Sequence, residues 1–366
     1  MKIALSIDAL SPQSTGIGRY TWELVRGIPN DPGVSKLLCY RNGMTTIHPE
    51  AFLRSGGYRL SKGRQWGERL KARFALRGSL FHGPNFFLPD NVEGGVITVH
   101  DLSVLKFPQT HPVERVRMFE TKFESSLSRA AHILTDCEHG RTELISWFGL
   151  SPERVTAVSL GAAEAFRPWG EAECIKVLRK YGIGRGGFAL CVATFEPRKR
   201  ILSAIDAYMQ AVKARSAPPL VLVGAAGWNN TALNEHIARA AHSGHILPLG
   251  YVDESDLPYI YAAARLFLYP SIYEGFGLPP IEAMACGVPT IVSDRSCLPE
   301  VTQGAAMLVD PDDIEGFSRA IERGLSDDIW RSQAIQAGLR VAAGYTWRTC
   351  VEKTVDVYRK VHSEMS

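Results

Sequence analysis

The sequence lacks long hydrophobic runs and has little excess charge of either sign. No stretch approaches the roughly 18 consecutive apolar residues that a membrane-spanning helix needs. The first apolar run, MKIALSID, reaches an acid at Asp8, which is too early for a signal peptide. The 41 basic and 38 acidic residues leave a net charge of +3, so the composition gives no reason to expect a nucleic-acid partner.

The sequence also lacks paired cysteines. Its 7 cysteines are scattered, odd in number and without a C-x-x-C spacing. This argues against a disulfide framework and a zinc site, and it is typical of the reducing cytosol. Asp310 and Asp312 form a D-x-D pair, but they stand between a strand-like and a helix-like run, where helix capping explains them better than a metal. We therefore expect a cytoplasmic protein with no metal ion and no other cofactor.

What the sequence does contain is a regular alternation of strand-like and helix-like runs. At roughly 150 residues per domain, 366 residues predict two domains. Most strand-like runs are rich in Val, Ile and Leu without alternation, as in strands buried on both faces of a parallel sheet. These runs include 3–7, 95–99, 133–135, 155–159, 188–194, 220–223, 265–269, 289–293 and 306–309. Helix-like runs lie near 18–28, 112–130, 201–214, 235–242, 255–264, 313–325 and 328–342.

This alternation predicts an α/β protein, and the pattern occurs twice. We expect two doubly wound, Rossmann-like domains, at 1–165 and 166–345, followed by a helix within 346–366. That helix either packs on the second domain or crosses back to brace the first. Two such domains side by side leave a central cleft at the carboxyl ends of both sheets, where open α/β sheets bind ligands.

The segment after residue 269 carries the strongest prediction of a binding site. Gly275 and Gly277 allow a tight turn and a close approach to a ligand, and two prolines then suit the first turn of a helix. The start of a helix is a natural seat for an anion. Glu274 and Glu282 bracket this place, and carboxylates accept hydrogen bonds from hydroxyl groups. A diphosphate between a ribose and a hexose fits such a site; the alternatives are a solvated loop acid and a simple helix-terminal charge.

Three consecutive cations, Arg198, Lys199 and Arg200, follow another buried strand. Like charges this crowded repel one another unless an anion neutralises them, and Arg and Lys both bind phosphate oxygens. The alternative is that the three cations are solvated at the start of a helix. This alternative is weaker because positive charges are unfavourable at a helix N-terminus.

Two segments of the first half also follow strand-like runs. Gly16 and Gly18 resemble a dinucleotide-binding loop weakly, because Thr21 replaces the third glycine, so they form either a loop near a ligand or a plain turn. His100 would face the ligand crevice and donate to a sugar hydroxyl or assist proton movement. The alternative is a structural histidine bonded to a carbonyl. Asp101 either orients His100 or caps the next segment.

The stretch from Arg59 to Arg77 is basic, with Trp66, Leu70 and Phe74 at helical spacing. Such a stretch could make peripheral contact with an anionic membrane or bind a lipid-diphosphate acceptor. The alternative is a solvated helix that packs its apolar stripe on the domain.

These residues together resemble a known family. The stretch from Glu274 through Glu282 to residue 290 is similar to the E-x7-E signature of the retaining glycosyltransferases of family 4, which have the GT-B fold. Segments 16–20, 100–101, 196–199, 250–253 and 298–301 fall in matching order, so the resemblance covers nearly the whole chain.

The resemblance implies a nucleoside-diphosphate sugar as donor and a saccharide or lipid-diphosphate-linked acceptor. Glu282 would bind the donor ribose, and Glu274 would face the transferred sugar. Arg198 and Lys199 would neutralise the diphosphate, and His100 would act with them in catalysis. The other donor-binding residues would be Gly16, Gly18, Val252, Gly275, Phe276, Gly277 and Leu278, with Asp101 and Arg19 on the acceptor side.

We therefore predict a metal-independent, retaining glycosyltransferase of GT-B fold. It would transfer mannose or a 6-deoxyhexose, from a GDP-linked donor, during assembly of a surface polysaccharide such as an O-antigen. It would be cytoplasmic or peripheral at the inner face of the membrane. Two alternatives stay open: a GT-B nucleotide-sugar epimerase and a non-catalytic nucleotide-sugar sensor.

Overall fold

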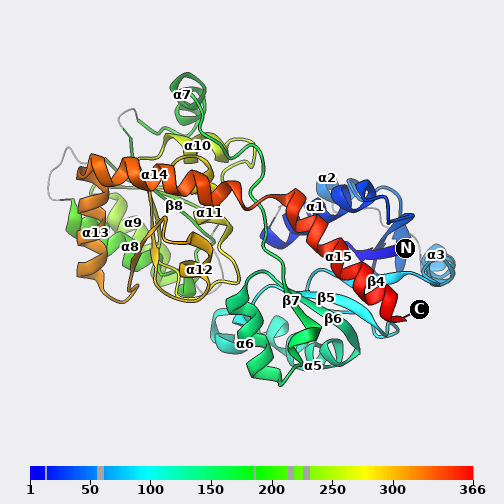
Figure 1. Cartoon of the computed structure of the whole chain (residues 1–366). Helices are drawn as coiled ribbons and strands as arrows, with labels where there is room; N and C mark the ends of the chain where they lie inside the picture. Colours follow the sequence, from blue (N-terminus) through cyan, green and yellow to red (C-terminus); the bar gives the residue numbers. More distant parts are fainter. Residues whose placement is uncertain (13–14, 56–61, 185–186, 213–217, 226–230, 366) are drawn as a thin grey trace. The chain divides into compact units, whose positions relative to one another are not determined.

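The computed structural model describes residues 1–12, 15–55, 62–184, 187–212, 218–225 and 231–365. The chain divides into two compact units, each built on one sheet (Figure 1). The first unit contains Met1–Leu102, Glu114–Gly161 and Trp347–Ser366, and the second contains Ser103–Val113 and Ala162–Thr346.

The first unit has a 7-stranded sheet in the order β3-β2-β1-β4-β5-β6-β7. Neighbouring strands are parallel, except that β2 and β3 form an antiparallel pair. The strands are β1 (Lys2–Ser6), β2 (Lys36–Arg41), β3 (Met44–Thr46), β4 (Leu80–Gly83), β5 (Gly95–Val99), β6 (Ala130–Thr135) and β7 (Val155–Ala157). The α-helices are α1 (Gly16–Gly27), α2 (Ala51–Ser55), α3 (Lys62–Ala75), α5 (Val113–Arg129), α6 (Glu138–Phe148) and α15 (Trp347–Met365), with short 3₁₀ turns at Ile28–Asn30 and Pro152–Arg154.

The second unit has a 6-stranded parallel sheet in the order β10-β9-β8-β11-β12-β13. Its strands are β8 (Ala189–Val192), β9 (Leu220–Val223), β10 (Ile246–Gly250), β11 (Leu266–Tyr269), β12 (Thr290–Ser293) and β13 (Met307–Val309). Its α-helices are α4 (Ser103–Lys106), α7 (Glu171–Lys180), α8 (Ile201–Ala211), α9 (Thr231–Ala241), α10 (Leu257–Ala263), α11 (Leu278–Ala285), α12 (Leu298–Thr302), α13 (Ile314–Ser326) and α14 (Asp328–Ala343). Short 3₁₀ turns lie at Pro108–Thr110 and Pro197–Lys199.

The central strands form the cores of both units. Every residue of β5, β9, β11 and β12 is buried, which explains why their sequences are apolar without alternation. Helices then cover these strands: α8 packs beside α13, and α11 beside α14. The prediction of two doubly wound α/β sheets is confirmed.

The division of the chain differs in detail from the predicted ranges. The units separate after Gly161, Ser103–Val113 joins the second unit, and α15 joins the first, where it contacts α1 and β6.

The D-x-D pair does not itself cap the helix that follows, although the sequence had suggested this. Asp313, the next residue, caps α13 by accepting a hydrogen bond from the Gly316 amide at 2.8 Å. Asp310 and Asp312 accept hydrogen bonds from Arg295 and Arg200.

Candidate active site

The candidate residues of the second unit lie where the strand order of its sheet reverses. Strands β8 and β11 are adjacent at the middle of the sheet, although many residues separate them in sequence. Open α/β sheets bind ligands at such a point, beyond the carboxyl ends of the strands. The segment after β8 supplies Arg198 and Lys199, and the segment after β11 supplies Glu274.

These three side chains form a buried ion cluster with Glu196. The Lys199 Nζ lies 2.5 Å from Glu274 Oε1, and Arg198 lies 3.5 Å from Glu274 Oε2 and 3.2 Å from Glu196 Oε2. The Lys199 Nζ also donates to the Tyr269 hydroxyl at 3.3 Å. Two cations and two carboxylates balance one another here, with each side chain at most 11% exposed.

This cluster corrects one step of the sequence argument. The crowded cations were expected to need an external anion, but the protein's own carboxylates already neutralise them. The third cation, Arg200, lies outside the cluster, because its side chain is 41% exposed and pairs with Asp312. Repulsion between the three cations therefore gives no independent support for a phosphate.

The cluster also controls the ionisation of its members. Burial opposes the charge on Glu274, but Lys199 and Arg198 outweigh it and lower the pKa of this carboxyl. Burial, together with the adjacent Arg198, lowers the pKa of Lys199. One carboxylate thus holds two cations at the end of β11.

The turn after Glu274 leads directly into helix α11, as the glycines and prolines predicted. Gly277 has a φ of 89°, and a Cβ there would lie 2.8 Å from the Leu298 side chain, so glycine is required at this position. Gly277 is the N-cap residue of α11, and prolines occupy its first turn. The helix therefore begins a few residues after Glu274, where the sequence predicted a seat for an anion.

Glu282 lies deeper in α11 than the sequence suggested. It is the fifth residue of the helix, beyond the first turn, and is only 3% exposed. The Tyr261 hydroxyl, from α10, donates to Glu282 Oε2 at 3.1 Å. A simple helix-terminal charge does not describe such a buried, hydrogen-bonded carboxylate, and Tyr261 is a partner that the sequence did not indicate.

The remaining predicted residues of the second unit are buried or lie in the turn before α11. Val252, Phe276 and Leu278 are buried, and the Phe276 ring packs edge-on against Tyr345 with centroids 5.3 Å apart. Gly275 stands between Glu274 and Phe276 in the same turn.

One contact in the second unit was not anticipated. Ser103–Val113 belongs to this unit, and its Phe107 ring lies 5.5 Å from the ring of Tyr273, the residue before Glu274. The Lys106 Nζ lies 4.6 Å from the centre of the same ring, within the range of a cation–π interaction. No sequence pattern connects residues so far apart.

In the first unit, Gly16, Gly18 and Arg19 belong to the first turn of α1 and not to a loop. The Thr15 hydroxyl caps this helix by accepting a hydrogen bond from the Gly18 amide at 3.1 Å, and Gly18 is buried. The Gly18 amide is therefore already engaged in capping a helix, where the sequence had predicted a loop near a ligand or a plain turn.

His100 follows β5 directly, and both of its ring nitrogens meet protein acceptors. Nδ1 lies 2.9 Å from an Asp136 carboxylate oxygen, and Nε2 lies 2.9 Å from the Pro84 carbonyl oxygen. The contact with a carbonyl is the one expected of a structural histidine, and Asp136 rather than Asp101 holds the ring. Burial opposes protonation, but the Asp136 carboxylate outweighs it and raises the pKa of His100.

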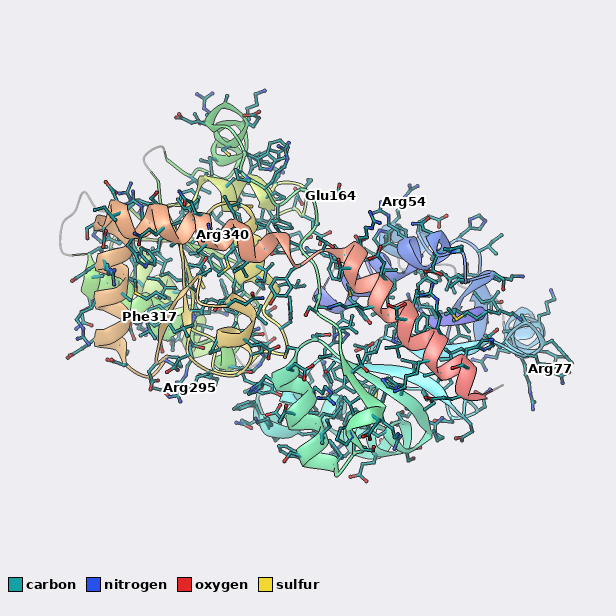
Figure 2. The ribbon with its side chains drawn as sticks, in the orientation of Figure 1. Arg54, Arg77, Glu164, Arg295, Phe317 and Arg340 are labelled. Carbon is teal, nitrogen blue, oxygen red and sulfur yellow. The ribbon has the colours of Figure 1, made fainter. Side chains whose placement is uncertain are left out.

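The basic segment forms helix α3, described from Lys62 onward, while Arg59 lies outside the described residues. Leu70 and Phe74 are 45% and 56% exposed, so this part of the apolar stripe does not pack into the unit. The Arg77 guanidinium, labelled in Figure 2, lies over the Phe74 ring at 4.7 Å.

Among the described residues, no helix is both long enough and apolar enough to cross a membrane. In the same part of the chain, no group of three or more His, Cys, Asp or Glu side chains could hold a metal ion.

Comparison with known proteins identifies the relatives of this chain. Residues 178–341 match the family model described as glycosyl transferases group 1. The chain is 37% identical over 380 residues to the Escherichia coli O-antigen chain mannosyltransferase B, covering 98% of this chain and 100% of that one. Among solved structures, a sucrose-phosphate synthase from Thermosynechococcus elongatus covers 100% of both chains, with a TM-score of 0.76 and 20% identity. Anabaena HepE, solved with UDP and glucose, covers 98% of this chain and 100% of its own, with a TM-score of 0.69 and 15% identity.

Proposed function

This chain belongs to the group 1 glycosyltransferases, and from that premise we propose that it transfers mannose from a nucleoside-diphosphate donor, with GDP-mannose as the first candidate. The observation that carries the proposal is the buried cluster of Arg198, Lys199 and Glu274 at the reversal point of the second sheet, beside the start of α11. Cations and a helix start suit the diphosphate, and Glu274 and Glu282 suit the hydroxyl groups at its two ends.

The choice of sugar and pathway is supported by the Escherichia coli relative, whose name describes an O-antigen mannosyltransferase. A 6-deoxyhexose is the second candidate sugar. The acceptor would be a saccharide, free or linked to a lipid diphosphate, that grows into a surface polysaccharide.

The proposed reaction retains the anomeric configuration and needs no metal ion. The bond between the anomeric carbon and the β-phosphate oxygen breaks, and the acceptor oxygen forms its bond on the same face of the sugar. The acceptor proton passes to the departing diphosphate. Lys199 and Arg198 would stabilise the charge that develops on this leaving group, which is commonly the largest contribution to such catalysis.

A peripheral membrane contact is a further part of the proposal. Helix α3 exposes the apolar side chains of Leu70 and Phe74 beside the cations Lys71 and Arg73, and the exposed Arg77 follows just after the helix. Such a surface suits an anionic leaflet that carries lipid-linked acceptors.

The test supplies GDP-mannose, UDP-glucose and ADP-glucose, each with and without an extract that contains lipid-linked acceptor. We expect acceptor-dependent release of GDP from GDP-mannose and an α-linked product. A new sugar nucleotide formed without acceptor would instead support the epimerase alternative. Binding without release of nucleoside diphosphate under any condition would support the sensor.

A further inference from the structure

We propose that Ser296 is a positioning residue, which holds the backbone of Glu274 so that its carboxylate meets Lys199 and the donor sugar. The inference rests on the proposed function for the role of Glu274. Ser296 lies in the turn between β12 and α12, just after Arg295, which Figure 2 labels. Nothing in the sequence analysis singled out this turn.

The Ser296 hydroxyl binds both backbone groups of Glu274. It accepts a hydrogen bond from the Glu274 amide at 3.2 Å and donates one to the Glu274 carbonyl at 2.7 Å. A hydroxyl can do both at once because it has one donor hydrogen and two acceptor lone pairs. One side chain thereby fixes the peptide groups on both sides of the Glu274 Cα.

The backbone of Ser296 is strained in the conformation that makes these bonds. Its φ is 57°, in the left-handed region that residues with a Cβ seldom adopt. Glycine would fit such a turn without penalty but would leave both backbone groups of Glu274 without the hydroxyl. Strain of this kind persists where the surroundings hold it in place, and it is concentrated at functional sites.

Neighbouring residues of the same turn hold the rest of the loop. The Cys297 thiol lies 3.3 Å from the Glu274 carbonyl oxygen and 3.2 Å from that of Phe276. The Ser293 hydroxyl donates to the Ser271 carbonyl, and Leu298 packs against Gly277. The segment 293–298 therefore braces the loop 271–277 along its whole length, with Ser296 at Glu274.

The experiment compares Ser296→Ala with Ser296→Gly. Alanine removes the hydroxyl and keeps the strain, whereas glycine removes both, so we expect Ser296→Gly to unfold at a temperature at least as high as Ser296→Ala. Both variants should lose kcat for sugar transfer by roughly tenfold to a hundredfold, the scale expected for a small misplacement of a reacting group. Their affinity for GDP alone, which Glu274 does not contact in the proposal, should stay within about threefold of the unmodified protein.

Gln303, the residue that ends helix α12, provides a matched control. It also has a left-handed backbone, with a φ of 48°, and its side chain binds the Tyr345 hydroxyl rather than the loop. Gln303→Gly should leave transfer unchanged. Full activity in Ser296→Gly, or an equal loss of GDP binding and transfer in both Ser296 variants, would overturn the positioning role.

Hydrogen–deuterium exchange separates this inference from the proposed function. A peptide that spans 271–278 should exchange faster in both Ser296 variants than in the unmodified protein or in Gln303→Gly, without any ligand present. Unchanged exchange would contradict the inference directly. If the unmodified protein transfers no sugar from any donor while this exchange difference is present, the proposed function fails and the role of Ser296 in holding the loop stands.

Discussion

At the scale of single residues, Lys199 carries the sharpest prediction. Replacing Lys199 by Ala removes the cation that lies 2.5 Å from Glu274, while Arg198 still partners that carboxylate. We expect kcat to fall by roughly 10²- to 10³-fold, the usual effect of removing one group that stabilises a developing charge. Arg200→Ala is the control, because this neighbouring cation is partly exposed and pairs with Asp312. Steady-state kinetics with thermal unfolding checks both variants, and normal turnover in a folded Lys199→Ala protein would refute the assignment.

The pair of His100 and Asp136 gives a second prediction at this scale. Both ring nitrogens of His100 face acceptors, so the arrangement favours the doubly protonated ring. Replacing Asp136 by Asn should lower the pKa of His100, because burial then acts with less opposition. If the charged ring supports transfer, the alkaline limb of the pH–rate profile moves to lower pH. An NMR titration of His100 measures the shift directly, and an unchanged titration would contradict the role of Asp136.

The same pair shows what sequence reasoning could and could not find about the site. The sequence singled out candidate residues because they follow buried strands, as His100 follows β5. Their partners were missed because pairing depends on strand register. Val99 of β5 is aligned with Thr135 of β6, so the next residues, His100 and Asp136, lie side by side. The neighbour in sequence, Asp101, looked like the partner only because register is invisible in one sequence.

At the scale of elements, the most buried strands were the most predictable. The ranges 95–99 and 220–223 agree with β5 and β9 at both ends. β2 was missed because charged residues stand at both of its ends and most of its side chains are only half-buried. β4 was missed because its four residues include a buried histidine, His82, which breaks the apolar pattern.

His82 also makes the packing of helix α15 sensitive to acid. Its Nδ1 lies 2.6 Å from the hydroxyl of Tyr358 in α15, and its Nε2 lies 2.8 Å from the Thr98 hydroxyl in β5. Burial, with the charge of His100 nearby, lowers the pKa of His82 to about 3. Below a pH of about 6.5 the unfolded chain binds a proton here that the folded chain does not, so this contribution to stability is lost as the pH falls toward 3.

We therefore expect the unfolding temperature of the first unit to fall between pH 6.5 and pH 4. The contribution of His82 to the free energy of unfolding decreases by up to about 1.4 kcal/mol per pH unit. His82→Gln should be less stable at neutral pH, yet its stability should depend less on pH in this interval, because glutamine does not titrate. Tyr358→Phe, which keeps His82, should retain the pH dependence. Parallel pH profiles for His82→Gln and the unmodified protein would exclude His82 as the source.

At the scale of the whole molecule, the alternation of apolar and amphipathic runs was enough to predict two doubly wound units. It could not assign the short segment Ser103–Val113 to the second unit, because that assignment depends on contacts with distant residues such as Tyr273. It also left the place of the last helix open. Tyr358 and His82 settle which unit α15 packs on, through a hydrogen bond that no periodicity predicts.

The division into units allows the binding of donor to be located without a transfer assay. GDP alone should protect the peptides around β8 and β11 from hydrogen exchange and leave β1 and β5 unchanged, because the proposed diphosphate site lies within the second unit. At a hundred times its dissociation constant, a ligand stabilises the state that binds it by about 2.7 kcal/mol, an effect large enough to measure. Lys199→Ala should weaken both the protection from exchange and the stabilisation by GDP. Protection by GDP confined to the first unit would contradict the proposed nucleotide site.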